Sequence, residues 1–272
     1  MTQARTTPLF VSHGAPLLPL QDTPARHFLE GLGAQMPRPK AILVVSAHWE
    51  TERPTVNAVA VNETIHDFYG FPAALYAMRY PAPGSAALAE RVAGLLTDAG
   101  LDPEIDRARG LDHGAWVPLI LVYPDADIPV IQLSVQTRLG TEHHLKVGRA
   151  LRPLLDEGVL ILGSGAFTHN LRELDRRGPD APETEWSSSF ADWMSRAIEE
   201  NRIDDLIAYR DRAPNAARNH PTEEHLLPLY VALGAAEPGA RPHRLHASAE
   251  YGSLRMDAFG FTPASAPSEK AA

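Results

Sequence analysis

Five of the twelve histidines occur where a strand is expected to end and a loop to begin, and they are His13, His48, His113, His169 and His225. Neutral imidazole is a common metal ligand in proteins and a common general base near neutral pH. Histidines that follow several strands would meet at one edge of a sheet. The pattern therefore predicts a single metal-centred site.

Three of these histidines form the strongest group, because each follows a predicted buried strand. The strands are residues 8–12, 41–46 and 159–162, followed by His13, His48 and His169. Any one of them could simply bond nearby backbone, so the interpretation depends on the set. Their small neighbours, including Gly163 and Gly165, are expected to leave room for a substrate beside the metal.

For the other two histidines, the sequence spacing leaves the role of each residue open. His225 ends a stretch that also holds three equal candidates for the ligand, His220, Glu223 and Glu224. His113 follows Asp112 and precedes a glycine, so it could approach a ligand as a base, with Asp112 or a backbone carbonyl fixing its tautomer. The alternative for His113 is a solvated turn residue.

The pattern of the whole chain predicts elements that could position these residues. A further strand is expected at residues 128–134, and helices at 85–99, 144–155, 186–200 and 226–233. Helices alternating with buried strands predict an α/β fold with a central, mostly parallel or mixed sheet flanked by helices on both faces. We expect one domain over residues 1–272, with a flexible tail at 262–272.

Residues 62–83 are rich in aromatics, glycine and proline, which is typical of a long ordered loop with a binding role. Within it, His66 lies beside Asp67, and we expect it to line a substrate pocket. The remaining histidines, His27, His143, His144, His243 and His246, are predicted to lie at the surface.

Composition excludes several classes of chemistry and of partner. There are no cysteines, so disulfides, thiolate catalysis and iron–sulfur clusters are excluded, and a metal must take N and O ligands. The formal charge of −9 and the lack of a basic stripe argue against nucleic acid. No apolar stretch is long enough to cross a bilayer, which predicts a cytoplasmic protein.

Ser164 lies in the sequence Gly-Ser-Gly, which lacks the residue spacing of the nucleophile elbow found in serine hydrolases.

Eight motifs resemble the 4,5-DOPA extradiol dioxygenase family, a branch of the class III (LigB-type) extradiol ring-cleavage superfamily. The motifs are SHGAP (12–16), SAHW (46–49), TIHDFYGFP (64–72), YPAPG (80–84), LDHG (111–114), YPDADIP (123–129), GSG with HNL (163–165 and 169–171) and PTEEH (221–225). The resemblance runs from about Pro8 to about Leu254 in a single order.

The resemblance implies roles for particular residues. The residues matching His13, His48 and His225 hold the metal, and the one matching His169 is counted as a ligand in some members. His113 matches a histidine that helps to deprotonate the catechol, so His113 and His169 are expected to be catalytic. We expect side-chain contacts with the substrate from His66, Asp67 and Tyr69.

The implied reaction is cleavage of a small aromatic diol such as DOPA by O2 with non-haem Fe(II), giving a semialdehyde. Relatives in the wider superfamily often use two histidines and a carboxylate, whereas this chain has His225 at the third position. Three neutral imidazoles would also suit Zn(II), which is redox-silent. The alternatives are a zinc hydrolase with Glu223 or Glu224 as general base, and a metal-binding member of the same fold without turnover.

Overall fold

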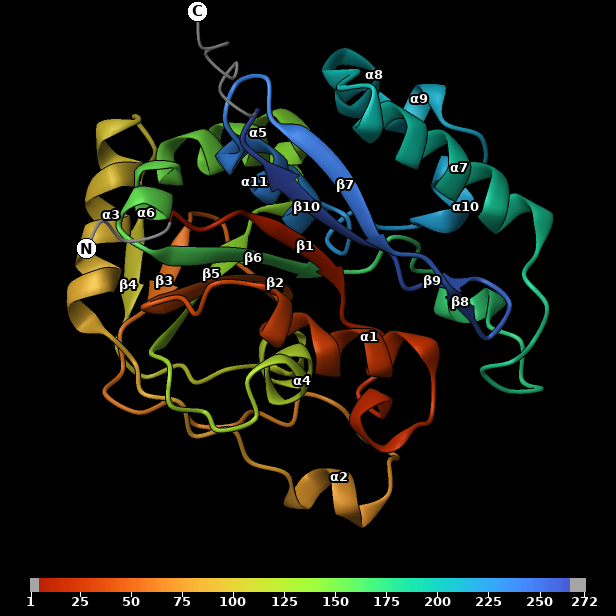
Figure 1. The fold of residues 1–272 in the computed structure, drawn as a ribbon, viewed down its shortest axis with the longest axis horizontal. Helices are drawn as coiled ribbons and strands as arrows, with labels where there is room; N and C mark the ends of the chain where they lie inside the picture. Colours follow the sequence, from red (N-terminus) through yellow and green to blue (C-terminus); the bar gives the residue numbers. More distant parts are fainter. Residues whose placement is uncertain (1–4, 265–272) are drawn as a thin grey trace, which may run out of the picture.

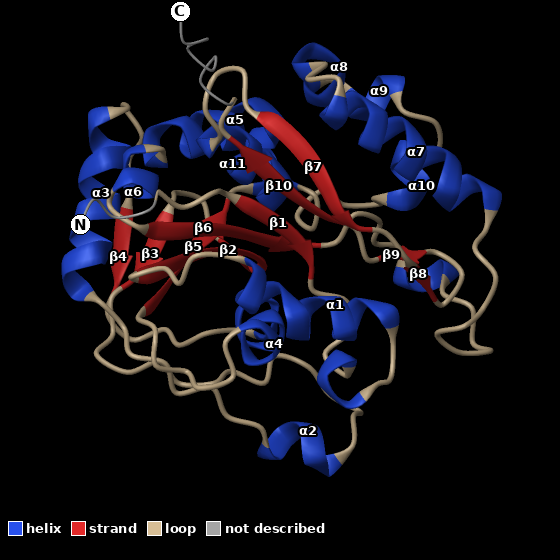
Figure 2. Cartoon of the chain, in the orientation of Figure 1, coloured by secondary structure: helices blue, strands red, loops and turns tan. Residues whose placement is uncertain are grey.

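Aliphatic runs build the centre of one large mixed sheet in the computed structural model, which describes residues 5–264 (Figures 1 and 2). The strand order is β4-β3-β5-β2-β6-β1-β10-β7. The strands are β1 (Leu9–Ser12), β2 (Ala41–Glu50), β3 (Thr55–Asn57), β4 (Glu104–Asp106), β5 (Val130–Val135), β6 (Val159–Gly165), β7 (Arg241–His246) and β10 (Ala258–Thr262). A separate antiparallel pair joins β8 (Ala249–Glu250) to β9 (Leu254–Arg255).

The four central strands, β5, β2, β6 and β1, run parallel, and both edges of the sheet add antiparallel pairings. Ile42 pairs with Leu160, and Leu9 pairs with Leu162. The carboxyl ends of β1, β2 and β6 therefore lie together at one edge. This confirms the predicted α/β fold and places the histidines that follow these strands near one another.

Helices cover both faces of the sheet. They are α1 (Pro24–Leu32), α2 (Ala73–Ala77), α3 (Ala86–Asp98), α4 (His113–Val122), α5 (Gly140–Leu151), α6 (Pro153–Asp156), α7 (Glu185–Glu199), α8 (Ile203–Ile207), α9 (Tyr209–Arg212), α10 (Ala216–Asn219) and α11 (Leu227–Ala235). Helices α4 and α1 pack on one face, and α11, α5 and α3 on the other (Figure 1). Every residue of α11, and all of α4 except Ile120, is buried, because both helices are apolar on all sides.

Several element boundaries differ from the sequence-based prediction, and two of these differences affect predicted features. Strand β2 continues to Glu50, so His48 lies within the strand and not beyond it. Thr262 is the last residue of β10, so the strand enters the segment predicted as a tail, and residues 265–272 of that segment lie outside the described residues. Within residues 5–264, no helix is long and apolar enough to cross a membrane.

His144 was predicted to lie at the surface, and this prediction is wrong. The residue is fully buried in α5, where Nδ1 lies 2.6 Å from the carbonyl oxygen of Gly140 and Nε2 accepts a hydrogen bond from the Gln136 amide at 3.1 Å. Burial lowers the pKa of His144 from 6.5 to about 3. His144 lies on the inward face of α5 beside Leu145 and Gly148. It was predicted to be exposed because of its polar residue type, without regard to which face of the helix turns inward.

Acidification is therefore expected to destabilise the fold. Between pH 6.5 and about 3, His144 is protonated in the unfolded state but neutral in the folded state. The free energy of unfolding therefore decreases by about 1.4 kcal/mol for each unit by which the pH is lowered in this range. Denaturant titrations at about pH 7 and about pH 5 should show a loss of about 2 kcal/mol from this residue, absent in His144→Gln. A control, His27→Gln at an exposed histidine, should keep the wild-type pH dependence; equal slopes in all three proteins would contradict the assignment.

Candidate metal centre

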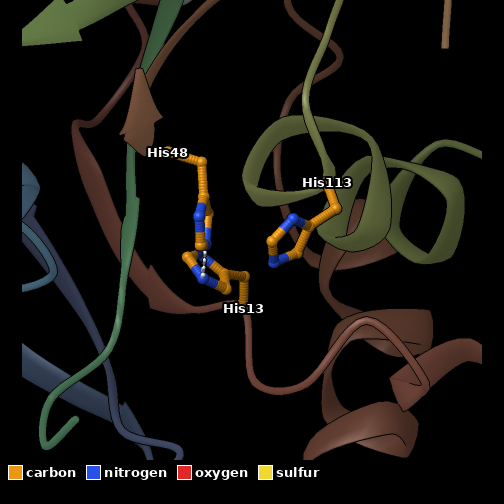
Figure 3. Close-up of side chains that lie close together, drawn as sticks. All are labelled: His13, His48 and His113. Atoms are coloured by element: carbon orange, nitrogen blue, oxygen red, sulfur yellow. Dashed lines mark hydrogen bonds between the residues drawn. The ribbon is translucent and has the colours of Figure 1, made fainter. Parts of the chain in front are cut away.

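Four of the predicted site histidines come together at the carboxyl edge of the central strands. Figure 3 draws three of these, His13, His48 and His113. His13 follows β1 directly, and His48 lies near the end of β2. His113 is the first residue of α4, and His225 lies two residues before α11. The two buried helices thus begin at the site, and their packing against the sheet fixes where His113 and His225 are held.

The Nε2 atoms of three histidines converge. His48 Nε2 lies 3.0 Å from His13 Nε2 and 3.2 Å from His225 Nε2. The His13 and His225 rings have centroids 5.5 Å apart. Three imidazole nitrogens from distant parts of the chain therefore point at one small volume.

The partners of the opposite ring nitrogens show which Nε2 atoms carry lone pairs. Ser164 Oγ donates its proton to the carbonyl oxygen of Gly114, so at 3.1 Å it accepts from His13 Nδ1–H. His225 Nδ1 lies 2.9 Å from Glu224 Oε1, and because a carboxylate oxygen accepts hydrogen bonds, the hydrogen lies on Nδ1. His13 and His225 thus both turn unprotonated Nε2 atoms toward His48, which can donate to only one of them. A divalent cation satisfies all three lone pairs, so the donor set fits a metal.

Burial keeps these imidazoles neutral. The pKa values of His13 and His225 lie well below 6.5, first because burial disfavours the charged form and then because neighbouring histidines would repel it. The pKa of His48 is lowered to about 3 by the same causes, burial first and the charge of His113 second. Neutral imidazole is the form that binds a metal ion.

His113 completes the cluster from the side of α4. Its ring centroid lies 3.8 Å from that of His48 and 5.6 Å from that of His13. The ligand atoms of His13, His48 and His113 lie within 4.8 Å of one another. His113 is buried, so the solvated turn considered as an alternative is wrong.

The partner of His113 is Asp67 and not Asp112, which the sequence suggested. Asp67 Oδ1 lies 2.9 Å from His113 Nδ1. Burial alone would raise the pKa of Asp67, but hydrogen bonding and the charge of His113 outweigh it and lower that pKa to about 2. Asp112 instead caps α4 through the Ala115 amide and accepts from Ser46 Oγ at 2.7 Å.

His169 reaches the site through stacking. Its ring lies parallel to that of His225, with centroids 3.4 Å apart and an interplanar angle of 11°. Its backbone amide donates to the carbonyl oxygen of Asn219 at 2.9 Å, which holds the loop after β6 against the segment that carries His225. Burial, followed by the charge of His113, lowers the pKa of His169 to about 4.

The other candidates between residues 220 and 225 have separate partners. His220 is fully buried, and its Nε2 lies 3.0 Å from the Phe167 carbonyl oxygen. Glu223 Oε1 accepts from the Tyr209 hydroxyl at 2.8 Å. Glu224 contacts the far side of the His225 ring. His225 is the residue of this stretch whose side-chain nitrogen lies beside His48.

The predicted substrate-contact residues are spread along the aromatic loop. Tyr69 is 92% exposed, and His66 Nε2 lies 3.2 Å from the Met78 carbonyl oxygen. The sequence did not single out Phe68, yet the edge of its ring approaches His66 and His113 at centroid distances of 5.6 and 5.7 Å. Its place between Asp67 and Tyr69 in a strongly aromatic loop is the signal that could have found it.

Gly163 and Gly165 make room for backbone. A Cβ on Gly165 would lie 2.0 Å from the carbonyl oxygen of His225, and one on Gly163 would lie 2.3 Å from that of Pro228. The Ala166 amide donates to the same His225 oxygen at 2.9 Å. The expectation that these glycines leave space for a substrate is corrected: their lack of side chains lets the His225 segment pack directly on β6.

Gly165→Ala is therefore expected to displace His225. We expect about 1–3 kcal/mol of destabilisation from overpacking, together with weaker metal binding, measured by denaturant unfolding and by titration with a metal-ion indicator. Gly94→Ala in α3, where a Cβ would meet no atom within 4 Å, is the matched control and should leave metal binding unchanged. Wild-type metal affinity in Gly165→Ala would show that this contact does not place His225.

Comparison with known proteins identifies the family of the chain. Residues 9–257 match the family model described as the catalytic LigB subunit of aromatic ring-opening dioxygenase. A 4,5-DOPA dioxygenase extradiol of Beta vulgaris is 46% identical over 93% of this chain and 95% of its own length. The protein of the same name in Escherichia coli K12 is 41% identical over 94% of each chain.

A solved structure has the same fold. The crystal structure of an uncharacterized protein from Escherichia coli K12 matches with a TM-score of 0.77 and 36% sequence identity, covering 94% of this chain and 99% of that one. The family match spans all five histidines. The chain therefore belongs to the LigB family of aromatic ring-opening dioxygenases.

Proposed function

We propose that this protein is an extradiol ring-cleaving dioxygenase that opens a catechol such as DOPA with O2 to a semialdehyde, using Fe(II). The observation that carries the proposal is the convergence of three Nε2 atoms in a chain of this family. Two of its relatives are named 4,5-DOPA dioxygenase extradiol, which supports the choice of DOPA as substrate.

His13, His48 and His225 would hold the metal through Nε2. When bound, Fe(II) would supply a Lewis-acidic, redox-active centre for the diol and O2. His169 stacks on the His225 ring and is the fourth candidate. The donor set does not distinguish iron from zinc, because Zn(II) also accepts three imidazoles and exceeds Fe(II) in the usual order of affinities.

The remaining histidines would move the protons. His113 faces the cluster from α4, with Nδ1 toward Asp67, which leaves Nε2 to accept a proton from a hydroxyl of the diol. His169 is neutral because burial lowers its pKa, so it can take up a second proton and return it later as an acid. Aromatic side chains, including Phe68 beside His113, would exclude water from the aromatic ring of the substrate.

The zinc hydrolase alternative requires a carboxylate that is free to act as a base. Glu223 accepts from the Tyr209 hydroxyl, and Glu224 contacts His225 Nδ1. Both carboxylates are thus engaged away from the point where the Nε2 atoms meet. This arrangement favours the dioxygenase over the hydrolase.

Oxygen uptake tests the proposal. Metal-free protein is loaded anaerobically with Fe(II), mixed with L-DOPA or another catechol, and exposed to O2 in an electrode cell. We expect one O2 consumed per catechol and a yellow ring-opened product, with catechol binding but no uptake in the Zn(II)-loaded protein. No uptake by iron-loaded protein with any of a panel of catechols would reject the proposed function, and catechol binding without uptake would favour the member without turnover.

A further inference from the structure

The Asp67 carboxylate holds His113 at two points. Oδ1 lies 2.9 Å from His113 Nδ1, and the same oxygen accepts the backbone amide of His113 at 3.0 Å. One oxygen thus contacts both the ring and the first turn of α4. The Asp67 side chain is 24% exposed, so the contact is largely shielded from water.

We propose that Asp67 is a positioning residue that acts through His113: its carboxylate keeps the proton on Nδ1 and so leaves Nε2 unprotonated toward the histidine cluster. This inference rests on the proposed function, in which His113 accepts a proton from the substrate. It replaces the expectation that Asp67 contacts the side chain of the substrate.

The surroundings of His113 leave Asp67 as the group that can set the tautomer. His113 Nδ1 is buried, and among residues 5–264 it has no partner that meets hydrogen-bond geometry; Asp67 Oδ1, 2.9 Å away, is the anionic oxygen beside it. Without an acceptor at Nδ1, the proton of a neutral imidazole is free to occupy Nε2. A base with its proton on Nε2 cannot accept another there.

The loop that carries Asp67 is itself held against α4. The Leu111 amide donates to the Glu63 carbonyl oxygen at 2.8 Å, and the Ile65 amide donates to the Leu111 carbonyl oxygen at the same distance. Trp116 Nε1 in α4 donates to the carbonyl oxygen of Ile65 at 2.9 Å. These bonds lie on the chain just before Asp67, so the carboxylate is positioned before substrate binds.

The distance between Asp67 and the proposed ligand His48 argues against a role of Asp67 through that histidine. Oδ2 lies 3.9 Å from His48 Nδ1, beyond hydrogen-bond range. Removing the charge of Asp67 should therefore alter His113 and leave metal affinity close to that of the wild type. This difference separates the two roles in experiment.

The first test observes the tautomer without turnover. Long-range 1H–15N spectra of Zn(II)-loaded protein report which nitrogen of each neutral imidazole bears the proton, and the His113 signals are those lost in His113→Gln. We expect Nδ1–H in the wild type and substantial Nε2–H in Asp67→Ala, which removes the acceptor beside Nδ1. Asp67→Glu keeps the carboxylate and should keep Nδ1–H. An unchanged tautomer in Asp67→Ala would overturn the proposal.

The second test is a double-mutant cycle on the iron-loaded enzyme. Asp67→Asn should lower kcat by at least about 10-fold, with KM and metal affinity within about 2-fold of the wild type. In the His113→Gln background the same change should cost nothing further, because Asp67 acts through that ring. An equal loss in both backgrounds, or a loss of metal that accounts for the fall in kcat, would overturn the proposal.

A charge-matched control lies on the same loop. Glu63→Gln removes one negative charge from an exposed side chain and should leave kcat and the His113 tautomer unchanged. Failure of the wild type to consume O2 would reject the proposed function, whereas the tautomer measurement would still decide whether Asp67 holds His113. The two proposals therefore fail in distinguishable ways.

Discussion

His225→Ala is expected to lose stoichiometric metal binding while the protein remains folded. Removing a direct ligand should weaken binding by more than the roughly 10- to 100-fold typical of a lost partner behind a ligand. His225 Nε2 lies 3.2 Å from His48 Nε2, so its loss leaves two of the three convergent nitrogens. Metal content after dialysis against a weak chelator, and competition with a metal-ion indicator, measure the effect.

The control for His225→Ala is His27→Ala, at a histidine that is 62% exposed and paired with Asp22. It should bind metal as the wild type does. Circular dichroism and denaturant unfolding establish that both variants are folded. An unchanged metal affinity in folded His225→Ala would show that the ion is held without this residue.

His113→Gln is expected to lower kcat by about 10²- to 10⁴-fold, the usual contribution of a general base. Metal content and catechol binding should stay close to those of the wild type, because the ion is assigned to His13, His48 and His225. Single-turnover rates with iron-loaded protein and anaerobic catechol titration separate the two effects.

The same variant separates a base from a ligand. His113 lies as close to His13 and His48 as a metal ligand would, because the ligand nitrogens of these three histidines lie within 4.8 Å of one another. Loss of bound metal in His113→Gln would place it in the coordination set. Full turnover with metal retained would show that the proton leaves the catechol by another route, with His169 as the candidate.

The sequence predicted the fold and the convergence of the histidines because both depend on short-range patterns. A buried aliphatic run predicts a central strand, and the carboxyl ends of parallel strands meet at one edge. His13, His48 and His169 were expected there on that basis alone. For His225 the spacing left four candidates, and only the resemblance to a family selected one.

The contacts behind the histidines could not be predicted in the same way. Asp67 and His113 are far apart in sequence, and their contact depends on how the aromatic loop pairs with Leu111. The burial of His144 depends on which face of α5 turns inward. The packing of His225 on Gly165 is a backbone contact between distant segments. Each of these depends on tertiary packing, which residue types do not encode locally.

The three convergent Nε2 atoms come from residues 13, 48 and 225, so a metal held by them would draw its ligands from nearly the full length of the described chain. During biosynthesis the last of these nitrogens emerges from the ribosome late, and the ion can be captured only afterwards. Once bound, an ion would cross-link the ends of two early strands to the segment before a late helix and oppose their separation. The identity of that ion would then depend on the cellular supply that the finished protein meets.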